Sequence, residues 1–290
     1  MRFSIRAAAV ALLLCLFCSG ALAEVTTDVS PLPWDMTPGF QADPENYSEN
    51  GYYDESISVE IDRQRRADAE VCVARVKIKH ASQLRTGLAT ELGSRANKPT
   101  AMAEGFRAVL ALNGDYYTDR KKGLVIRQGQ TLRDASTDLY DVLLIDTAGD
   151  FHIVKRDNLD MLDFYLSGAL TIQNAFSFGP ALVIDGEMQQ IPEKYSFAPH
   201  YKNPRAAIGQ LGPLEYVFVV VDGRQENSDG MTLETLAQTM ADLGCTQAYN
   251  LDGGNSATLV LGGVIQNNKS VANERSISDI IYFATSVYSE

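Results

Sequence analysis

The sequence is poor in cysteine, histidine and positive charge, and it has no apolar run of membrane length. Only 4 cysteines and 3 histidines occur among 290 residues, and neither type is grouped at the spacing of a zinc site. A structural zinc centre is therefore disfavoured. Two of the cysteines lie in the N-terminal leader described below, so Cys72 and Cys245 remain. They are expected to form either a disulfide or two buried free thiols.

The shortage of positive charge limits the partners of the chain. The formal net charge is −12, and it becomes −14 when the leader is removed with Arg2 and Arg6. Such a surface repels nucleic acid and anionic lipid, so an anionic ligand needs a local basic pocket. The sequence also lacks a Walker motif, a dinucleotide fingerprint, an EF-hand loop and the nucleophile elbow of the α/β hydrolases.

The first residues have the composition of a secretory signal peptide. Arg2 and Arg6 precede the apolar run 7–17, which ends in the small-residue sequence Ala21-Leu22-Ala23. The apolar run is too short to span a bilayer comfortably. We therefore expect residues 1–23 to be cleaved, and the remaining 267 of the 290 residues to be secreted without a stable membrane span.

After the leader, the pattern predicts an acidic arm and one α+β domain. Residues 24–50 are rich in Pro, Asp, Glu and Thr and read as an extended arm, and the domain covers residues 51–290. Thr100 and Thr232 are expected to cap helices. Alternating or apolar segments predict short strands, so we expect mixed, largely antiparallel sheets packed with a few helices. These strands are expected at 56–61, 71–80, 108–112, 142–145, 151–154, 181–184, 206–208, 216–221, 256–261 and 277–283.

Three acids follow apolar strands, where loops commonly assemble binding and catalytic sites. They are Asp115, Asp222 and Asp252. Each one alone is most simply a turn-capping residue. Together with neighbouring amides such as Asn113 and Asn255, they favour a polyhydroxylated, sugar-like ligand that needs paired donors and acceptors.

A second group of residues could bind an anion. Arg205 follows Pro204 at the start of a predicted strand, where a guanidinium could hold a phosphate through two parallel hydrogen bonds. The segment from Asp222 through Arg224 to Ser228 and Gly230 leads into the helix capped by Thr232, and a helix N-terminus attracts anions. Surface ion pairs and a capped loop are the structural alternatives.

Four motifs, taken in order, resemble the phosphodiester glycosidase family. They are Asn113-Gly114-Asp115-Tyr116-Tyr117, Asn203-Pro204-Arg205-Ala206-Ala207-Ile208-Gly209, Asp222-Gly223-Arg224 with Ser228-Asp229-Gly230-Met231-Thr232, and Leu251-Asp252-Gly253-Gly254-Asn255-Ser256. The resemblance covers residue 51 to the C-terminus. The chain departs from the family at two places, with Asn255 where members usually have a third glycine and Ser276 where they usually have a proline.

The resemblance implies hydrolysis of a glycosyl phosphodiester to a sugar and a phosphate monoester. A phosphate monoester is already a good leaving group, so stabilising it matters more than protonating it. Arg205 would bind the phosphate, and Asp252 or Asp115 would act as nucleophile or base while the other orients the sugar. The substrate-binding residues implied are Asn113, Asp222, Arg224, Ser228, Gly230, Gly253, Gly254, Asn255 and Ser256.

Two other functions fit the same residues. A metal-dependent phosphodiesterase would hold a divalent cation on Asp115, Asp222 and Asp252 and break the P–O bond. A non-catalytic module that binds cell-wall glycan would need only the amides and the aromatic residues Tyr116 and Tyr117. No cofactor is certain from the sequence, and the expected partner is a phosphodiester-linked glycan or a sugar phosphate conjugate.

Overall fold

Antiparallel β-sheet is the main secondary structure of the protein. In the computed structural model, which describes residues 29–89 and 97–288, the strands form three sheets, and every strand pair in them is antiparallel. The predicted signal peptide lies outside the described residues. The expected α+β class with a largely antiparallel sheet structure is confirmed.

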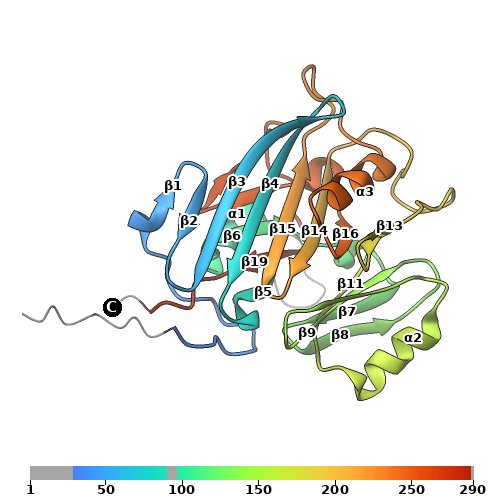
Figure 1. Ribbon diagram of the computed structural model, residues 1–290, viewed down its shortest axis with the longest axis horizontal. Coiled ribbons are helices and arrows are strands. Elements are labelled where there is room, and N and C mark those ends of the chain that lie inside the picture. The colour runs from blue at the N-terminus through green and yellow to red at the C-terminus, as the bar shows by residue number, and fades with distance from the viewer. Residues whose placement is uncertain (1–28, 90–96, 289–290) are drawn as a thin grey trace, which may run out of the picture.

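The largest sheet has nine strands (Figure 1). In spatial order they are β1 (Tyr47–Ser48), β2 (Gly51–Tyr53), β3 (Ile57–Arg66), β4 (Ala69–Ile78), β15 (Glu215–Val221), β14 (Arg205–Gly212), β16 (Gln247–Leu251), β12 (Ala181–Ile184) and β13 (Glu187–Met188). Along the strands at its centre, buried valine and other apolar residues face layers on both sides, which explains their continuous apolar sequences.

Two five-stranded sheets complete the β structure. The first contains β10 (Phe151–Val154), β9 (Val142–Asp146), β11 (Ile172–Ser177), β7 (Gly123–Arg127) and β8 (Gln130–Ala135). We call it the small sheet. The second contains β18 (Val264–Ile265), β17 (Leu259–Leu261), β6 (Leu110–Asn113), β19 (Asp279–Phe283) and β5 (Leu84–Leu88), and we call it the inner sheet.

Three helices cover the outer faces of these sheets. They are α1 (Pro99–Gly105) on the inner sheet, α2 (Leu159–Phe164) on the small sheet and α3 (Leu233–Asp242) on the nine-stranded sheet. The main core lies between the nine-stranded sheet and the two smaller sheets. Single-turn helices occur at Pro44–Asn46, Ala81–Gln83, Tyr117–Asp119 and Gly254–Ser256, and a π-helical turn at Tyr165–Ala169 follows α2.

Of the two threonines predicted to cap helices, Thr232 does so and Thr100 does not. Thr232 accepts a hydrogen bond from the Thr235 amide, as predicted, and caps α3. The prediction that Thr100 caps α1 is wrong, because the helix begins at Pro99, whose missing N–H suits the first helical position. The Thr100 hydroxyl donates instead to Glu274.

Most of the predicted strands are present, with shifted ends. The segments 151–154 and 181–184 match β10 and β12, whereas the predicted strand 256–261 is shortened to β17 because Gly254–Ser256 forms a helical turn. The strands β7, β8 and β11 were not predicted. The side chains of β8 are exposed or half-buried along its whole length. Its sequence therefore lacks the alternation of apolar and polar residues that would have predicted a strand.

The structure places the described part of the predicted arm and both of the remaining cysteines. Residues 29–50 of the predicted arm pack on the domain, where the carbonyl oxygens of Pro33, Asp35 and Thr37 accept hydrogen bonds from the buried guanidinium of Arg85. Cys72 and Cys245 are free, buried thiols in different core clusters. Of the two alternatives, the structure therefore has free thiols.

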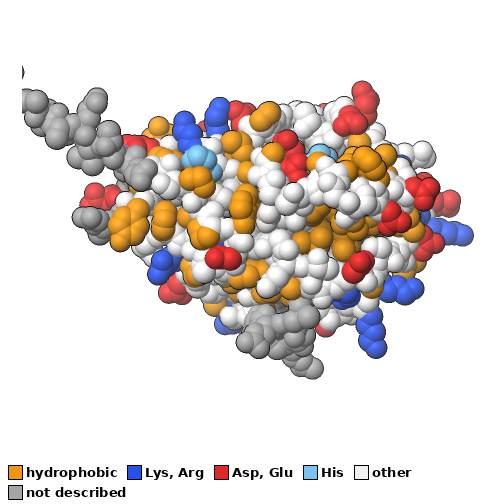
Figure 2. Space-filling view, turned by 90° about the horizontal axis from the view of Figure 1, so that it is seen from below, with side chains coloured by type: hydrophobic (Ala, Val, Ile, Leu, Met, Phe, Trp, Pro, Cys, Tyr) orange, Lys and Arg blue, Asp and Glu red, His pale blue; other side chains and the backbone are white. Residues whose placement is uncertain are grey.

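The face seen in Figure 2 carries several clusters of hydrophobic side chains. In the sequence, exposed large hydrophobic residues are concentrated in α2, where Leu159, Met161 and Phe164 are 37%, 39% and 58% exposed.

Among the described residues, no helix combines the length and the apolar character required to cross a membrane.

A buried ion-pair cluster joins the small sheet to the inner sheet. Arg127, at the end of β7, places its Nη2 atom 3.0 Å from Asp115 Oδ1 and 2.7 Å from Asp279 Oδ2. All three side chains are fully buried, and the guanidinium also lies over the Phe176 ring at 3.9 Å. Burial raises the pKa of Asp279, because the ionised carboxylate loses its hydration. We call Asp115, Arg127 and Asp279 the buried triad.

Replacing Arg127 by methionine should destabilise the protein strongly. The variant keeps much of the side-chain volume but leaves the buried Asp279 carboxyl without a counter-charge and Asp115 with only Arg120 at 3.7 Å. Breaking a buried ion pair in this way typically costs about 3–5 kcal/mol. Urea unfolding measures the change. Lys77→Met is the control, since its ion pair with Glu215 has side chains 68% and 43% exposed and should contribute less than about 1 kcal/mol. Equal effects of the two substitutions would contradict this role for the triad.

Candidate active site

One end of the nine-stranded sheet carries a polar pocket. β14 begins there at Arg205, paired with Val221 at the end of β15, while Leu251 ends β16 beside Ala206. The loops that follow β15 and β16 therefore meet at this edge. They surround a pocket of about 280 Å³. Its lining residues are Phe178, Phe197, Ala198, Asn203, Arg205, Arg224, Leu251, Asp252, Gly253, Gly254, Asn255 and Arg275.

Residues 252–258, here called the acid turn, form the floor of this pocket. Asn113 holds both ends of the turn, donating from Nδ2 to the Asp252 carbonyl at 2.6 Å and accepting from the Thr258 amide at 3.1 Å. The Gly254 amide donates to the Pro204 carbonyl at 2.8 Å. A Cβ atom at Gly253 would lie 2.6 Å from that carbonyl oxygen, so the close approach to the next strand requires glycine.

Asp252 is the acid in the pocket. Its side chain is only partly exposed, and burial raises its pKa to about 6. The guanidiniums of Arg275 and Arg120 oppose that rise, and the negative charge of Asp115 adds to it. The Ser256 hydroxyl is fully buried beside the carboxyl and favours its ionised form, although its contact falls short of a well-formed hydrogen bond. Asp252 therefore exchanges its proton close to neutral pH.

Three guanidinium groups line the pocket together with this carboxyl. Arg224 donates to Asn203 Oδ1 at 2.8 Å and to Asn255 Oδ1 at 3.4 Å, and Arg275 donates to the Tyr116 hydroxyl at 3.2 Å. Arg205 is the third. Within residues 29–89 and 97–288, none of the three forms an ion pair with a carboxylate. Their positive charge is therefore directed at whatever enters the pocket.

Arg205 contributes to the pocket in a different way from the other two. It is 3% exposed, and it donates to the carbonyl oxygens of Met231 at 2.9 Å, Phe197 at 3.2 Å, Ala198 at 2.8 Å and Tyr201 at 2.7 Å. One N–H remains free of these bonds. Burial, followed by the nearby charge of Arg224, lowers its pKa to about 10, so it is still cationic at neutral pH.

The wall held by Arg205 is aromatic. Phe197 and Ala198 both have left-handed backbone conformations, with φ of 70° and 51°, which non-glycine residues adopt at a cost. The Phe197 ring stacks on Phe178 with centroids 3.9 Å apart. Behind them the guanidinium of Arg120 lies 5.1 Å from the Phe178 centroid and 5.8 Å from that of Phe197. A flat apolar face of this kind suits the C–H surface of a sugar ring.

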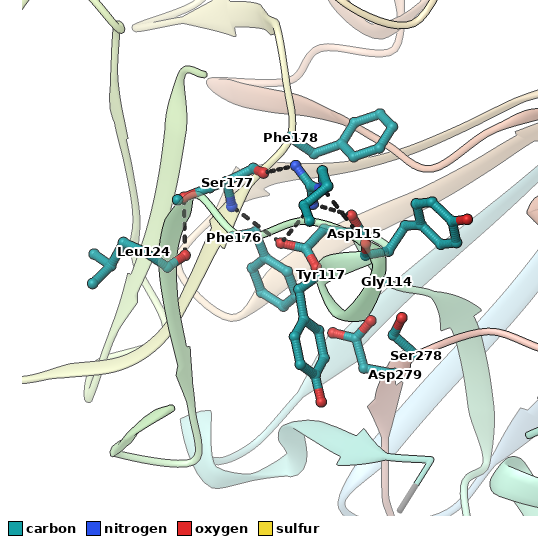
Figure 3. A network of polar contacts seen from close by, with 12 residues as sticks. Gly114, Asp115, Tyr117, Leu124, Phe176, Ser177, Phe178, Ser278 and Asp279 are labelled. Carbon is teal, nitrogen blue, oxygen red and sulfur yellow. Dashed lines mark hydrogen bonds and ion pairs between the residues drawn. The ribbon is translucent and has the colours of Figure 1, made fainter. Parts of the chain in front are cut away.

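The other predicted site residues lie behind the pocket. Figure 3 shows the Asp115 side chain pointing toward Ser177, whose amide donates to Asp115 Oδ2 at 3.1 Å, with Asp279 nearby. Asp222 accepts hydrogen bonds from Asn267 Nδ2 and the Asn268 amide, and Ser228 donates to the Asp222 carbonyl. Gly230 packs against the backbone of Asn203, where a Cβ would lie 2.4 Å from the carbonyl oxygen.

A metal-dependent phosphodiesterase would need several metal-ligating side chains close together. Among the described residues, no group of three or more His, Cys, Asp and Glu side chains is placed to hold a metal ion. Asp115 is paired with Arg127, Asp222 is bound by amides, and Asp252 faces guanidiniums. These three carboxylates therefore do not form a cation site together.

Several pocket residues were not named as site residues from the sequence. Asn203 lies in a motif quoted for the family resemblance, and Arg275 directly precedes Ser276, where the chain departs from the family, so a signal for both was present. Phe178 and Phe197 come from connecting segments without a motif, and only the fold shows that they meet. Lys269, which contacts the acid turn from behind, was also missed.

Comparison with protein families agrees with the fold and the pocket. The profile described as "Phosphodiester glycosidase" matches residues 106–284, which is more than half of the chain. The chain belongs to the phosphodiester glycosidase family. The family match includes β6, β14, β16 and all lining residues of the pocket. Membership supports a glycosidase-type function.

Solved structures share the fold. The catalytic domain of zebrafish N-acetylglucosamine-1-phosphodiester alpha-N-acetylglucosaminidase, auto-inhibited by its pro-peptide, matches with a TM-score of 0.63 and 19% identity, over 85% of this chain and 86% of that chain. A hypothetical protein from Synechocystis matches with a TM-score of 0.53 and 18% identity, over 79% of this chain and 62% of that chain. At these identities the likeness concerns the fold.

A sequence relative in Bacillus subtilis strain 168 is an uncharacterized protein, YomE, derived from the SPbeta prophage. It is 28% identical over 186 residues, which are 62% of this chain and 28% of the relative. The chain thus spans little more than a quarter of the length of that relative.

Replacing Asp252 by asparagine should stabilise the protein at neutral pH. The pKa of Asp252 is about 6 in the folded protein, above its ordinary value of 3.8, so the folded state binds the proton more tightly than the unfolded state. Stability therefore falls as pH rises through this window, and an amide avoids that loss. We expect a gain on the order of 2 kcal/mol at pH 7.5 that shrinks toward pH 4.

Urea unfolding at the two pH values measures this gain. Glu215→Gln is the control, because that carboxylate is exposed at the far end of β15. A variant less stable than the original protein at pH 7.5 would contradict the burial of the Asp252 charge.

Proposed function

We propose that this protein is a glycosidase that hydrolyses a glycosyl phosphodiester at the bond between the anomeric carbon and oxygen. The observation that carries the proposal is the pocket that Asp252 shares with Arg205, Arg224 and Arg275, none of which is ion-paired within the described part of the chain. In a chain of net charge −12, such a concentration of positive charge fits an anionic substrate.

The phosphate is proposed to lie between Arg224 and Arg275. Both guanidiniums are exposed and bonded to neutral oxygen atoms, so a phosphate can replace or add to those bonds. Arg205 adds its charge and its free N–H from the pocket wall while it keeps that wall in place. The three cations stabilise the negative charge that grows on the leaving phosphate monoester.

The sugar is proposed to lie between the aromatic wall and the acid turn. The half-buried ring of Phe197, stacked on the buried Phe178, contacts its apolar face, and the amide of Asn255 reaches its hydroxyl groups. Asn255 occupies the place of a glycine that is usual in the family. Its side chain narrows the pocket beside Arg224, so we propose that it restricts which sugars fit.

Asp252 is proposed as the catalytic carboxylate. With a pKa of about 6 it is mostly ionised at neutral pH, which suits attack on the anomeric carbon or removal of a proton from water. Water supplies the hydroxyl group of the sugar product, and its proton is released. Attack through a covalent intermediate retains the anomeric configuration and direct attack by water inverts it, so the product configuration separates the two roles.

Asp115 is proposed as a positioning residue rather than as the second acid. Its carboxylate is enclosed by Arg127, Arg120 and the Ser177 amide and does not line the pocket. Its negative charge raises the pKa of Asp252 from behind. A phosphate leaving group needs little protonation, so a single carboxylate in the pocket is sufficient.

The position of the broken bond tests the proposal directly. N-acetylglucosamine 1-(4-nitrophenyl phosphate) is the first probe, because the name of the zebrafish relative describes an N-acetylglucosamine 1-phosphodiester. In ¹⁸O-labelled water, cleavage of the C–O bond places the label in the sugar, and mass spectrometry detects it there. Label in the phosphate product would instead support a phosphodiesterase. Binding without turnover across a panel of sugars would support a glycan-binding module.

Substitutions in the pocket should separate catalysis from phosphate binding. Asp252→Asn should lower kcat by about 10² to 10⁴-fold, and Arg224→Ala should lower kcat/KM by about 10² to 10³-fold. The control Lys77→Ala removes an exposed cation on β4 and should keep full activity. Full activity in the Asp252→Asn variant would remove this residue from the mechanism.

We also propose that the protein is exported. The charge and apolar pattern of residues 1–23 supports cleavage after Ala23. N-terminal sequencing of the protein recovered from outside the cytoplasm should begin at Glu24. An intact N-terminus on protein retained in the cytoplasm would contradict export.

A further inference from the structure

A lysine behind the pocket makes contacts that the proposed catalysis does not use. Lys269 is half-buried, and its ammonium donates to three oxygen atoms of the acid turn. These are the carbonyl oxygens of Asn255 and Ala257, each at 2.8 Å, and the Thr258 hydroxyl at 2.6 Å. An ammonium has three N–H groups, so all the donors of Lys269 are bonded to this turn.

The contacts of Lys269 complement those of Asn113. Asn113 holds the two ends of the acid turn, whereas Lys269 binds carbonyl oxygens in its middle and the hydroxyl of Thr258 at its end. The carbonyl oxygens that it binds belong to the helical turn Gly254–Ser256 and the residue after it. With the carbonyl groups held there, the side chain of Asn255 reaches Arg224 on the pocket side.

The loop that carries Lys269 is itself anchored. Asn267 donates to Asp222 Oδ1 at 3.2 Å and to the Ala257 carbonyl at 3.3 Å, and the Asn268 amide donates to Asp222 Oδ2 at 3.1 Å. Ser270 donates to Asn255 Oδ1 at 3.3 Å. Asp222, predicted as a site residue, therefore acts on the pocket through the loop of residues 267–270.

We propose that Lys269 is a positioning residue whose ammonium holds the acid turn so that Asp252 and Asn255 face the pocket. The inference rests on the proposed function, because it assigns Lys269 a part in that reaction. Lys269 does not itself line the pocket. It acts through the turn that carries the carboxylate.

The charge of Lys269 is also sensitive to pH. Burial lowers its pKa to about 8, while Glu274, Asp222 and Asp252, on three different segments around it, favour the charged form. A neutral amine has one N–H fewer and a weaker hold on the carbonyl groups. The turn therefore loses part of its support as pH rises through about 8.

Activity should consequently have a bell-shaped dependence on pH. The acid limb lies near 6, where Asp252 loses its proton, and the alkaline limb lies near 8, where Lys269 loses its own. Lys269→Arg keeps the charge at alkaline pH, so its alkaline limb should move upward by more than one pH unit. Lys269→Met should lower kcat by about 10- to 100-fold with little change in KM, and its alkaline limb should disappear.

Kinetics of the probe N-acetylglucosamine 1-(4-nitrophenyl phosphate) against pH test these expectations, with thermal unfolding as the check on folding. Lys202→Met is the matched control, since that lysine is exposed and paired with Asp229. An alkaline limb that is the same in the original protein and in both Lys269 variants would overturn the proposal, as would unchanged kcat in Lys269→Met.

A second measurement does not depend on turnover or on the folding of Lys269→Met. The ¹³C carboxyl resonance of Asp252, followed by NMR in the original protein, should show a second small shift centred near pH 8 as Lys269 loses its charge. In Lys269→Arg this shift should be absent. A resonance that stays constant above pH 7 in the original protein would overturn the positioning role, whereas absence of turnover with this shift present would count against the proposed reaction alone.

Discussion

The pairing of one buried guanidinium with two buried carboxylates fixes how the smaller sheets meet. Arg127 comes from the end of β7 in the small sheet, Asp279 comes from β19 in the inner sheet, and Asp115 lies two residues after β6 of the inner sheet. A buried charge is tolerated only where its partners are held in place, so the relative position of the two sheets is tightly specified. The Ser177 amide, from β11, adds a further bond across the same junction.

The pocket depends on that junction because its floor is attached to the same strand. Asn113 ends β6, only two positions before Asp115, and holds both ends of the acid turn. Asp252 follows β16, so its backbone joins the nine-stranded sheet to the inner sheet. The carboxyl group is thus placed by a turn anchored on two sheets rather than by a flexible loop, which is the rigidity that the proposed catalytic carboxylate needs.

The sequence was sufficient to predict much of the fold and only part of the pocket. Thr232 and the apolar spacing after it predicted α3, and the apolar runs predicted the central strands, because local capping and burial determine those elements. Strand β8 was missed because its side chains are not buried on alternate positions. In the pocket, Asp252 and Arg224 belong to recognisable motifs, and the structure places them together.

The roles of other residues depend on contacts between distant segments. Asp115 and Asp222 both follow apolar strands, as Asp252 does, and nothing in their sequence shows that one is enclosed by arginines and the other by amides. Arg205 was expected to hold phosphate, yet most of its N–H groups donate to main-chain carbonyl oxygens. Phe178 and Phe197 lie in separate connecting segments, and only the folded structure brings their rings into contact.

The way in which Arg205 supports the aromatic wall has an evolutionary consequence. Every acceptor that it binds there is a main-chain oxygen, so the anchorage does not depend on which side chains the wall carries. Residues 197–201 can therefore change their identity across related enzymes while the attachment point stays the same. Such an arrangement lets new substrate preferences arise by drift in one short segment, without disturbing the acidic centre on which turnover would depend.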